Sequence, residues 1–163
     1  MSTHQPTRRQ MLACAAGLAS LAALPAGAAP AAQPMVQVWK DPSCGCCKDW
    51  IAHMQANGFA TTVHEIGNAG ARARLGLPRE LGSCHTALVD GYVLEGHVPA
   101  QDVQRLLKQR PKALGLAVPG MPVGSPGMDG PVYGGRKDAY EVLLVKRGAK
   151  AEDVRTEVYA RYS

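Results

Sequence analysis

The sequence predicts an α/β protein in which helices flank a central mixed sheet. Short runs rich in strand-forming residues, the first at residues 35–39, alternate along the chain with segments of helical periodicity. The length of 163 residues, with 46% hydrophobic side chains, suits one domain with a substantial core. A long loop rich in Gly, Pro and Met separates this alternating part from a C-terminal strand pair.

The first strand leads into a helix that begins within a cluster of cysteines. Asp41-Pro42-Ser43 is a turn sequence, and Ser43 is suited to cap the helix that follows. Asn57-Gly58 should end this helix, because both residues tolerate the left-handed conformation found at helix C-termini. Its apolar residues fall on one face at i, i+3, i+4 and i+7 spacing, namely Cys47, Trp50, Ile51 and Met54.

The middle of the chain continues the alternation of strands and helices. We expect a strand at residues 59–66, a short helix at 69–75, a hairpin of residues 86–90 and 92–95, and a helix that Pro99 opens. Val103, Leu106 and Leu107 should face the core from that helix. Residues 111–135 show no periodicity and are expected to form an irregular loop, either functional or disordered. Closing strands are expected at residues 141–145 and 157–162.

The N-terminus carries the three regions of an export signal. Arg8 and Arg9 precede an apolar run at residues 12–24, and Pro25 and small residues at 26–28 follow it. The run is shorter than the roughly 20 residues that a membrane span needs. We therefore expect residues 1–28 to be a twin-arginine signal peptide, 29–35 a disordered leader and 36–163 a periplasmic domain that is not inserted in the membrane.

The composition excludes several classes of function. Without Arg8 and Arg9 the chain keeps 16 basic and 13 acidic residues, a formal charge of +3. These bases are scattered and aromatic residues make up only 5% of the chain, so no nucleic-acid partner is expected. The sequence contains no recognisable Ser-His-Asp set, paired carboxylates or phosphate-binding loop, and it assigns no catalytic residue.

The cysteines carry the chemical signal, and they allow three interpretations. The four outside the signal peptide are Cys44, Cys46, Cys47 and Cys84. A disulfide framework is one interpretation, but a bridge between the adjacent Cys46 and Cys47 would be strained, and a domain of this size needs no covalent framework. Thiol–disulfide exchange is the second, because Cys44 and Cys47 form a Cys-x-x-Cys motif at a helix N-terminus, where thiolates are favoured.

Metal binding is the third interpretation. The four thiolates and the imidazole of His85 would form a compact soft-ligand set, in which adjacent cysteines favour thiolates that bridge several ions. Such surroundings select Cu(I), with Zn(II) as the usual competitor. Met121 and Met128, in the long loop, favour copper because thioethers bind Cu(I) well, and His97 ends the hairpin near that loop. Three similar residues are not assigned as ligands: Met54 is expected in the core, and His53 and His64 at the surface.

The segment around the cysteines resembles the active-site strand, turn and helix of thioredoxins. Residues 38–48 match that region, and residues 83–91 fall where thioredoxins place their cis-proline segment and hairpin. The resemblance implies a thioredoxin-like fold in which Cys84 and His85 lie over the turn that carries Cys44 and Cys47. His85 takes the position of the proline, which is thought to keep metals away, and Cys46 is an added thiol. Both departures argue against thioredoxin-like turnover.

Four motifs together resemble one family more closely. They are PSCGCC at residues 42–47, SCHT at 83–86, EGHVP at 95–99 and GLAVPGMPVGSPGM at 115–128. They are similar to the CopG-like copper-resistance family, long catalogued as a domain of unknown function, and the resemblance runs from Val36 to about Tyr162. It implies a periplasmic thioredoxin-like domain whose Cys-x-Cys-Cys segment holds a cysteine-bridged Cu(I) cluster. It also implies a role in copper detoxification, through a change in the oxidation state of copper.

The leading hypothesis is a periplasmic copper-binding protein of copper resistance that holds several Cu(I) ions. Such a cluster could also cycle electrons, which would make the protein a copper oxidoreductase. The runner-up is a thiol–disulfide oxidoreductase that uses Cys44 and Cys47, with Cys84 as a resolving thiol. The third hypothesis is a copper carrier that passes metal to a pump or to another periplasmic copper-handling protein. The expected metal ligands are Cys44, Cys46, Cys47 and Cys84 as the thiolate core, with His85, His97, Met121 and Met128 outside it.

Overall fold

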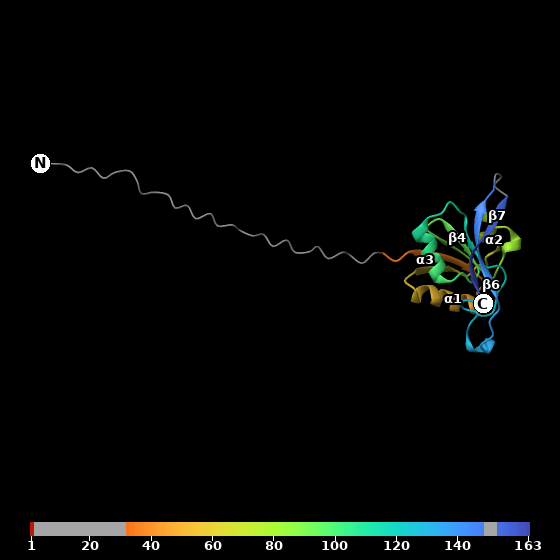
Figure 1. The fold of residues 1–163 in the computed structure, drawn as a ribbon. Coiled ribbons are helices and arrows are strands. Elements are labelled where there is room, and N and C mark those ends of the chain that lie inside the picture. Colours follow the sequence, from red (N-terminus) through yellow and green to blue (C-terminus); the bar gives the residue numbers. More distant parts are fainter. Residues whose placement is uncertain (2–31, 149–152) are drawn as a thin grey trace. The chain divides into compact units, whose positions relative to one another are not determined.

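A computed structural model describes Met1 and residues 32–148 and 153–163 of the chain (Figure 1). Residues 32–163 form a mixed α/β unit on one seven-stranded sheet, with the strand order β2-β1-β3-β4-β5-β6-β7. Apart from Met1, the expected signal peptide lies outside the described residues, as do residues 29–31 of the expected leader.

The strands are β1 (Met35–Lys40), β2 (Ala60–His64), β3 (His85–Val89), β4 (Tyr92–Glu95), β5 (Gly115–Ala117), β6 (Tyr140–Arg147) and β7 (Val154–Tyr162). The helices are α1 (Gly45–Ala56), α2 (Ala69–Arg74) and α3 (Ala100–Gln109), with short 3-10 turns η1 (Arg79–Leu81) and η2 (Pro131–Tyr133).

The pairing of the first four strands positions the cysteine segment. β1 and β2 are parallel, with α1 as the crossover between them. β3 runs antiparallel to β1, and Lys40 at the end of β1 lies opposite His85 at the start of β3. The hairpin from β3 to β4 turns at Asp90 and Gly91, whose φ angles of 48° and 84° suit the two-residue turn that matches strand twist. The cysteines after β1 and the cysteine before β3 therefore lie at the same end of the sheet.

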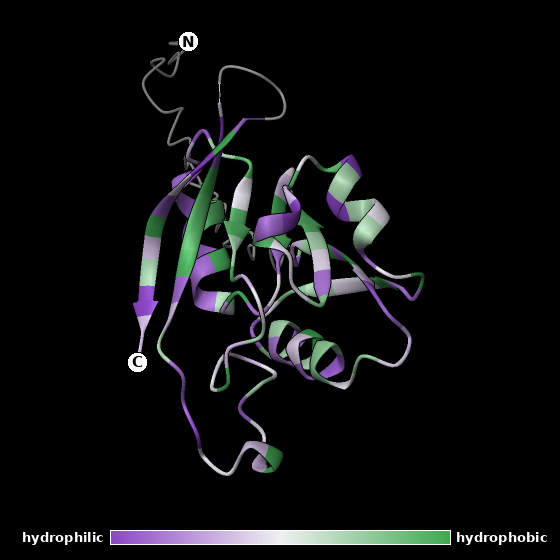
Figure 2. Ribbon diagram, turned by 90° about the vertical axis from the view of Figure 1, so that its right-hand side faces the viewer, coloured by the Kyte–Doolittle hydropathy of each residue, from purple (hydrophilic) through white to green (hydrophobic). Residues whose placement is uncertain are grey.

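One hydrophobic cluster joins α1 and α3 to the central strands. Figure 2 shows hydrophobic residues along these strands, whereas the helices alternate between hydrophobic and hydrophilic along their length. The indole N–H of Trp50, which is fully buried, donates a hydrogen bond to the carbonyl oxygen of Val98 at 2.9 Å. The helical residues expected to face inward do so: Trp50, Ile51 and Met54 from α1, Val103 and Leu106 from α3, and Leu107, which is partly buried.

The long segment 111–135, expected to be irregular throughout, contributes one strand to the sheet. β5 lies between β4 and β6, parallel to the first and antiparallel to the second. A Cβ added at Gly115 would lie 1.7 Å from the carbonyl oxygen of Val93, so only glycine fits there. A strand of three buried residues is too short to show alternation, which is why periodicity did not reveal it. Beyond β5, the segment forms η2 and otherwise irregular backbone.

The cap of α1 also differs from the expectation. Its N-cap residue is Cys44, not Ser43, and no side chain caps the helix. The backbone N–H of Ser43 instead donates to a carboxylate oxygen of Asp41 at 2.9 Å, which stabilises the preceding turn. The positive end of α1 is therefore left without a side-chain acceptor at the point where the cysteines lie.

The long loop folds back onto the first turns of α1. Gly127 has a φ of +84°, and a Cβ added there would lie 2.6 Å from the carbonyl oxygen of Cys46 and 2.7 Å from the backbone nitrogen of Trp50. Its N–H donates to a carboxylate oxygen of Asp129 at 3.1 Å. This close approach of two backbones requires glycine, and it places the loop against the cysteine segment.

Two histidines expected at the surface have structural contacts. His53 is partly buried, and its Nε2 accepts a hydrogen bond from the backbone N–H of Ala100, the first residue of α3, at 3.0 Å. Burial lowers the pKa of His53, with the charge of Asp129 opposing this shift. His64 is also partly exposed, and its ring stacks on Trp39 with 5.1 Å between the ring centroids.

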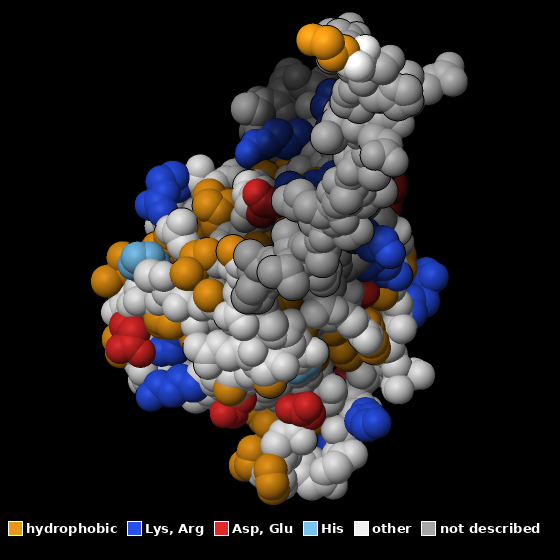
Figure 3. Space-filling view, turned by 90° about the vertical axis from the view of Figure 1, so that its left-hand side faces the viewer, with side chains coloured by type: hydrophobic (Ala, Val, Ile, Leu, Met, Phe, Trp, Pro, Cys, Tyr) orange, Lys and Arg blue, Asp and Glu red, His pale blue; other side chains and the backbone are white. Residues whose placement is uncertain are grey.

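The surface carries charges of both signs. On the face shown in Figure 3, basic and acidic side chains are interspersed. Within residues 32–148 and 153–163, no helix has the length and apolar character needed to cross a membrane.

We predict that His53→Ala lowers the free energy of unfolding by about 1 kcal/mol, because the first N–H of α3 loses its acceptor. The pKa of His53 is lowered in the fold, so below its ordinary value of 6.5 the unfolded chain binds a proton that the fold rejects. Stability should therefore decrease as the pH falls below 6.5, and less steeply in the variant. Urea unfolding of metal-free protein on both sides of this pH measures the effect. Identical pH dependence in wild type and variant would contradict it.

We also predict that Gly127→Ala destabilises the fold by roughly 2–4 kcal/mol, since it combines a steric clash with an unfavourable positive φ. The matched control is Gly130→Ala, in the same loop, where an added Cβ meets nothing within 4 Å and φ is −69°. The control should change stability by less than about 0.5 kcal/mol. Thermal unfolding of both variants is the measurement, and equal losses of stability would refute this account of the loop.

Candidate metal centre

All four cysteines of the folded unit meet at one end of the sheet. Cys44 is the N-cap of α1, and Cys46 and Cys47 lie in its first turn. Cys84 directly precedes β3. The four Sγ atoms all lie within 4.8 Å of one another, a spacing from which several could bind the same ion. The structure thus brings together the complete thiolate core that the sequence predicts.

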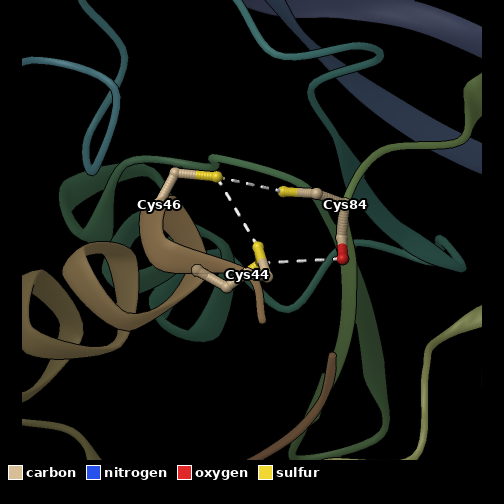
Figure 4. Close-up of side chains that lie close together, drawn as sticks. Cys44, Cys46 and Cys84 are labelled. Atoms are coloured by element: carbon tan, nitrogen blue, oxygen red, sulfur yellow. Dashed lines mark hydrogen bonds between the residues drawn. A yellow bond between two sulfur atoms is a disulfide. The ribbon is translucent and has the colours of Figure 1, made fainter. Parts of the chain in front are cut away.

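The four sulfur atoms are not equivalent. Cys44 and Cys47 are joined by a disulfide, whereas Cys46 and Cys84 are free thiols. The Sγ atom of Cys46 lies 3.6 Å from the Sγ of Cys44 and 3.8 Å from the Sγ of Cys84 (Figure 4). The structure therefore represents the oxidised form of the Cys-x-x-Cys pair, and four thiolates become available only when this disulfide is reduced.

Two histidines adjoin the sulfur atoms on the side of Cys84. The Sγ of Cys84 lies 3.1 Å from Nε2 of His97 and 3.4 Å from Nδ1 of His85. His97 donates from Nδ1 to the carbonyl oxygen of Pro126 at 2.8 Å, so its Nε2 lone pair faces Cys84. His85 is fully buried, and its Nε2 has no hydrogen-bond partner among the residues that the structure describes. Buried polar atoms without a partner are uncommon in folded proteins.

Burial controls the protonation of these groups. It lowers the pKa of His97, and it lowers the pKa of His85 well below its usual value, with the charge of His97 as a second cause. Both imidazoles are therefore neutral near pH 7 and can offer a lone pair to a metal ion. Burial, together with the nearby Cys46, raises the pKa of Cys84 to about 12. The thiol of Cys84 therefore stays protonated near pH 7, and a bound metal ion would have to displace this proton.

A buried ion pair holds the backbone on both sides of Cys84. Glu95, fully buried at the end of β4, accepts a hydrogen bond from the backbone N–H of Ser83 at 2.7 Å and one from the hydroxyl of Thr86 at 2.6 Å. Arg72 of α2 pairs with the same carboxylate at 2.7 Å and donates to the carbonyl oxygen of Ser83 at 2.6 Å. Sequence analysis missed this pair, although a lone acidic residue at the end of an apolar strand was an available signal.

The two predicted methionine ligands occupy different surroundings. Met128 is buried, and the hydroxyl of Tyr133 lies 3.1 Å from its sulfur atom. Met121 is 53% exposed and lines a surface pocket of about 440 Å³ together with Cys84 and Arg79. The six cysteines and histidines among the predicted ligands form one continuous group, in which Cys84 belongs both to the four-cysteine set and to the set with His85 and His97.

The donor chemistry of this group fits a soft metal ion. Four sulfur atoms and two imidazoles, without a carboxylate among them, are the ligands that Cu(I) and Zn(II) prefer. Nδ1 of His85 and Nε2 of His97 both face the Sγ of Cys84, so the group could bind a metal ion.

Comparisons with known proteins agree with this picture. The family model described as "Protein of unknown function, DUF411" matches residues 81–128, the stretch that carries Cys84, His85, His97 and both methionines. Among curated proteins, no significant match was found. Two solved structures are similar, described as "Copper resistance protein copG", Form 2 and Form 1. Each is 46% identical and covers 80% of this chain, and the matches cover 99% and 98% of their own chains with TM-scores of 0.71 and 0.70.

The mixed sheet and three helices described above match the fold of these structures. With 46% identity over 80% of its length to solved CopG structures, this chain belongs to the DUF411 family of copper resistance protein CopG.

Proposed function

We propose that this protein is a periplasmic copper-binding protein of copper resistance, and that its reduced form holds a cysteine-bridged Cu(I) cluster. The observation that carries the proposal is the gathering of Cys44, Cys46, Cys47 and Cys84 within 4.8 Å. The similar CopG structures are described as copper resistance proteins, which supports copper as the metal. The periplasmic location rests on the N-terminal sequence alone.

The sulfur spacing supports bridging thiolates. Two thiolates on one ion, with metal–sulfur bonds of about 2.3 Å, lie at most ~4.6 Å apart. Cys46 meets this limit with both Cys44 and Cys84, at 3.6 and 3.8 Å. Cys46 and Cys47 are neighbours in sequence and cannot both turn toward one ion in good geometry, so we assign Cys46 as a bridge between ions.

We further propose that the first part of the fold is thioredoxin-like. Its support is the parallel β1-α1-β2 unit, the β3–β4 hairpin antiparallel to β1, and α3 after the hairpin. In this arrangement the cysteines at the N-terminus of α1 face Cys84 before β3, as the sequence resemblance implies.

We propose as outer ligands of the cluster His85, His97, Met121 and Met128. We also propose interconversion of Cu(I) and Cu(II) as a further activity of the centre.

Thiol–disulfide exchange is the second candidate, and one observation favours it. Cys44 and Cys47 form a disulfide at the N-terminus of α1, which suits reversible oxidation. The proposed resolving thiol is poorly suited, because the raised pKa of Cys84 leaves little thiolate to attack a disulfide.

A copper carrier that hands its metal to another protein remains the third candidate, supported by the exposed Met121 in the pocket beside Cys84.

We predict that Cys46→Ser abolishes the cluster. Anaerobic, reduced wild-type chain should bind several Cu(I) ions with the four thiols of the centre masked, whereas the variant should retain about one or none. Elemental analysis and thiol titration measure the two quantities, and Cys14→Ser is the control for the loss of a thiol elsewhere in the chain. Unchanged copper stoichiometry in Cys46→Ser would overturn the proposal. Insulin reduction by metal-free protein that is indifferent to Cys46→Ser would favour thiol exchange.

We also predict that Glu95→Gln weakens Cu(I) binding although it removes no ligand. The amide is nearly isosteric but neutral, so the guanidinium of Arg72 and the N–H of Ser83 lose the charge of their shared acceptor and hold the segment of Cys84 less tightly. Loss of such support lowers metal affinity by roughly 10–100-fold. Competition with a Cu(I) chelator gives the affinity. Glu141→Gln, which removes an exposed ion pair with Arg161, is the matched control and should leave the affinity unchanged. Equal affinities for the two variants would contradict this positioning role.

A further inference from the structure

We propose that the surface pocket beside Cys84 binds a small thiol that carries carboxylate groups, and that such a thiol exchanges Cu(I) with the centre. The pocket has a volume of about 440 Å³, and its lining comes from α2, η1, the segment before β3 and the long loop. The exchange step rests on the proposed Cu(I) function, whereas binding of the thiol to the pocket can be measured without metal.

The lining of the pocket is positively charged. It contains Arg72 and Arg79, and none of its other residues is acidic. Buried Glu95 offsets the charge of Arg72, so the net charge of the lining comes from Arg79. Arg79 is exposed, and it makes no ion pair or side-chain hydrogen bond with any residue that the structure describes. Its guanidinium is therefore available to a carboxylate, whose planar shape it can match with two hydrogen bonds.

Arg72 adds a hydrogen-bond donor that its ion pair does not use. Its Nε and Nη2 atoms are bound to Glu95, and Nη2 also donates to the carbonyl oxygen of Ser83. Nη1 donates to no residue within the described parts of the chain, and it would lie 3.0 Å from a Cβ added at Gly82. Gly82 itself lines the pocket, so the space that a Cβ would fill beside Nη1 stays open. A carboxylate in this space can accept a hydrogen bond from Nη1.

Sulfur-containing side chains adjoin this carboxylate site. Cys84 and Met121 both line the pocket, and Met121 is largely exposed. The Sγ of Cys84 lies 3.9 Å from the hydroxyl oxygen of Ser83, and that hydroxyl donates to the carbonyl oxygen of Gly120. A ligand whose carboxylate binds the arginines therefore holds its other end close to a predicted copper ligand. A thiol is the group at that end that can compete with cysteine for Cu(I).

The size and the mixed lining of the pocket favour a small molecule with two kinds of functional group. Pockets that bind small molecules commonly have volumes of about 300–1,000 Å³. A phosphate ion would pair with the arginines, but its hard oxygen atoms would gain nothing from the sulfur atoms of Cys84 and Met121. A molecule with a carboxylate at one end and a thiol at the other uses both parts of the lining.

The exchange step requires no change in oxidation state. A Cu(I) ion leaves a protein thiolate and binds the sulfur atom of the incoming thiol. The proton that this thiol releases goes to the protein thiolate left behind, so atoms and charge balance, and the reverse sequence loads the centre. Binding of the carboxylate raises the effective concentration of the thiol beside Cys84, which accelerates the exchange.

The first experiment measures binding to the pocket without metal. The protein is the full chain, freed of metal and with Cys44 and Cys47 oxidised, and the probe is S-methylglutathione, which has two carboxylates but no free thiol. Ligand-observed NMR should show one saturable site. Its affinity should fall by about fivefold in Arg79→Gln, and by about tenfold when the probe is the diethyl ester, which lacks the carboxylate charges. The matched control is Arg155→Gln, an exposed arginine of β7, and it should leave the affinity unchanged.

The second experiment measures the exchange of copper. The reduced chain is loaded with Cu(I) under anaerobic conditions and mixed with glutathione or with its diethyl ester, which present the same thiol with and without carboxylate charges. Elemental analysis of the desalted protein at successive times gives the rate of copper loss. We expect the loss to glutathione to be about fivefold faster than the loss to the ester. Arg79→Gln should remove most of this difference, and Arg155→Gln should keep it.

Three results would overturn the inference: no saturable binding of S-methylglutathione, equal affinity in Arg79→Gln and Arg155→Gln, or equal rates of copper loss to the two thiols. Failure of the proposed function has a different signature, because the reduced chain would then hold no Cu(I), while the metal-free chain would still bind the probe and still distinguish the two arginine variants.

Discussion

The antiparallel pairing of β1 with β3 is the constraint on which the rest of the centre depends. It places Lys40, the last residue of β1, opposite His85, the first residue of β3. The segments just beyond these residues carry Cys44 to Cys47 on one side and Cys84 on the other, 37 or more positions apart in sequence. A shift of this register by two residues would move the two segments by about 7 Å relative to each other, which exceeds the spacing at which their sulfur atoms now meet.

Two further sets of contacts fix the positions of the paired segments. The Glu95–Arg72 ion pair ties the backbone around Cys84 to β4 and α2. The contact of Gly127 with the first turns of α1 ties the long loop to the Cys-x-Cys-Cys segment and places the carbonyl of Pro126 against His97. Both lie outside the set of predicted ligands, yet both decide where a predicted ligand points. Metal centres commonly depend on such supporting contacts as much as on the ligands themselves.

Much of the fold followed from the sequence because its signals are local. Helical spacing of Trp50, Ile51 and Met54 identified α1 and its buried face, and Asp90-Gly91 identified the β3–β4 turn. The exceptions depend on distant partners. β5 is a strand because it pairs with both β4 and β6, and only glycine fits at position 115 between them. The N–H of Ala100 donates to His53 because α1 and α3 pack side by side. Neither contact has a signature within its own segment.

The sequence by itself determined the donor types of the candidate centre: soft sulfur donors clustered at a helix N-terminus, with histidines and methionines in later segments. Residue type and close spacing suffice for that conclusion, because donor softness is a property of the side chain. Only the tertiary structure decided which donors meet. It brought Cys84, His85 and His97 to the other cysteines, left Met121 largely exposed, and recruited Glu95 and Arg72 as supports. These outcomes depend on strand register and on the path of the long loop, which are set by packing across the whole domain.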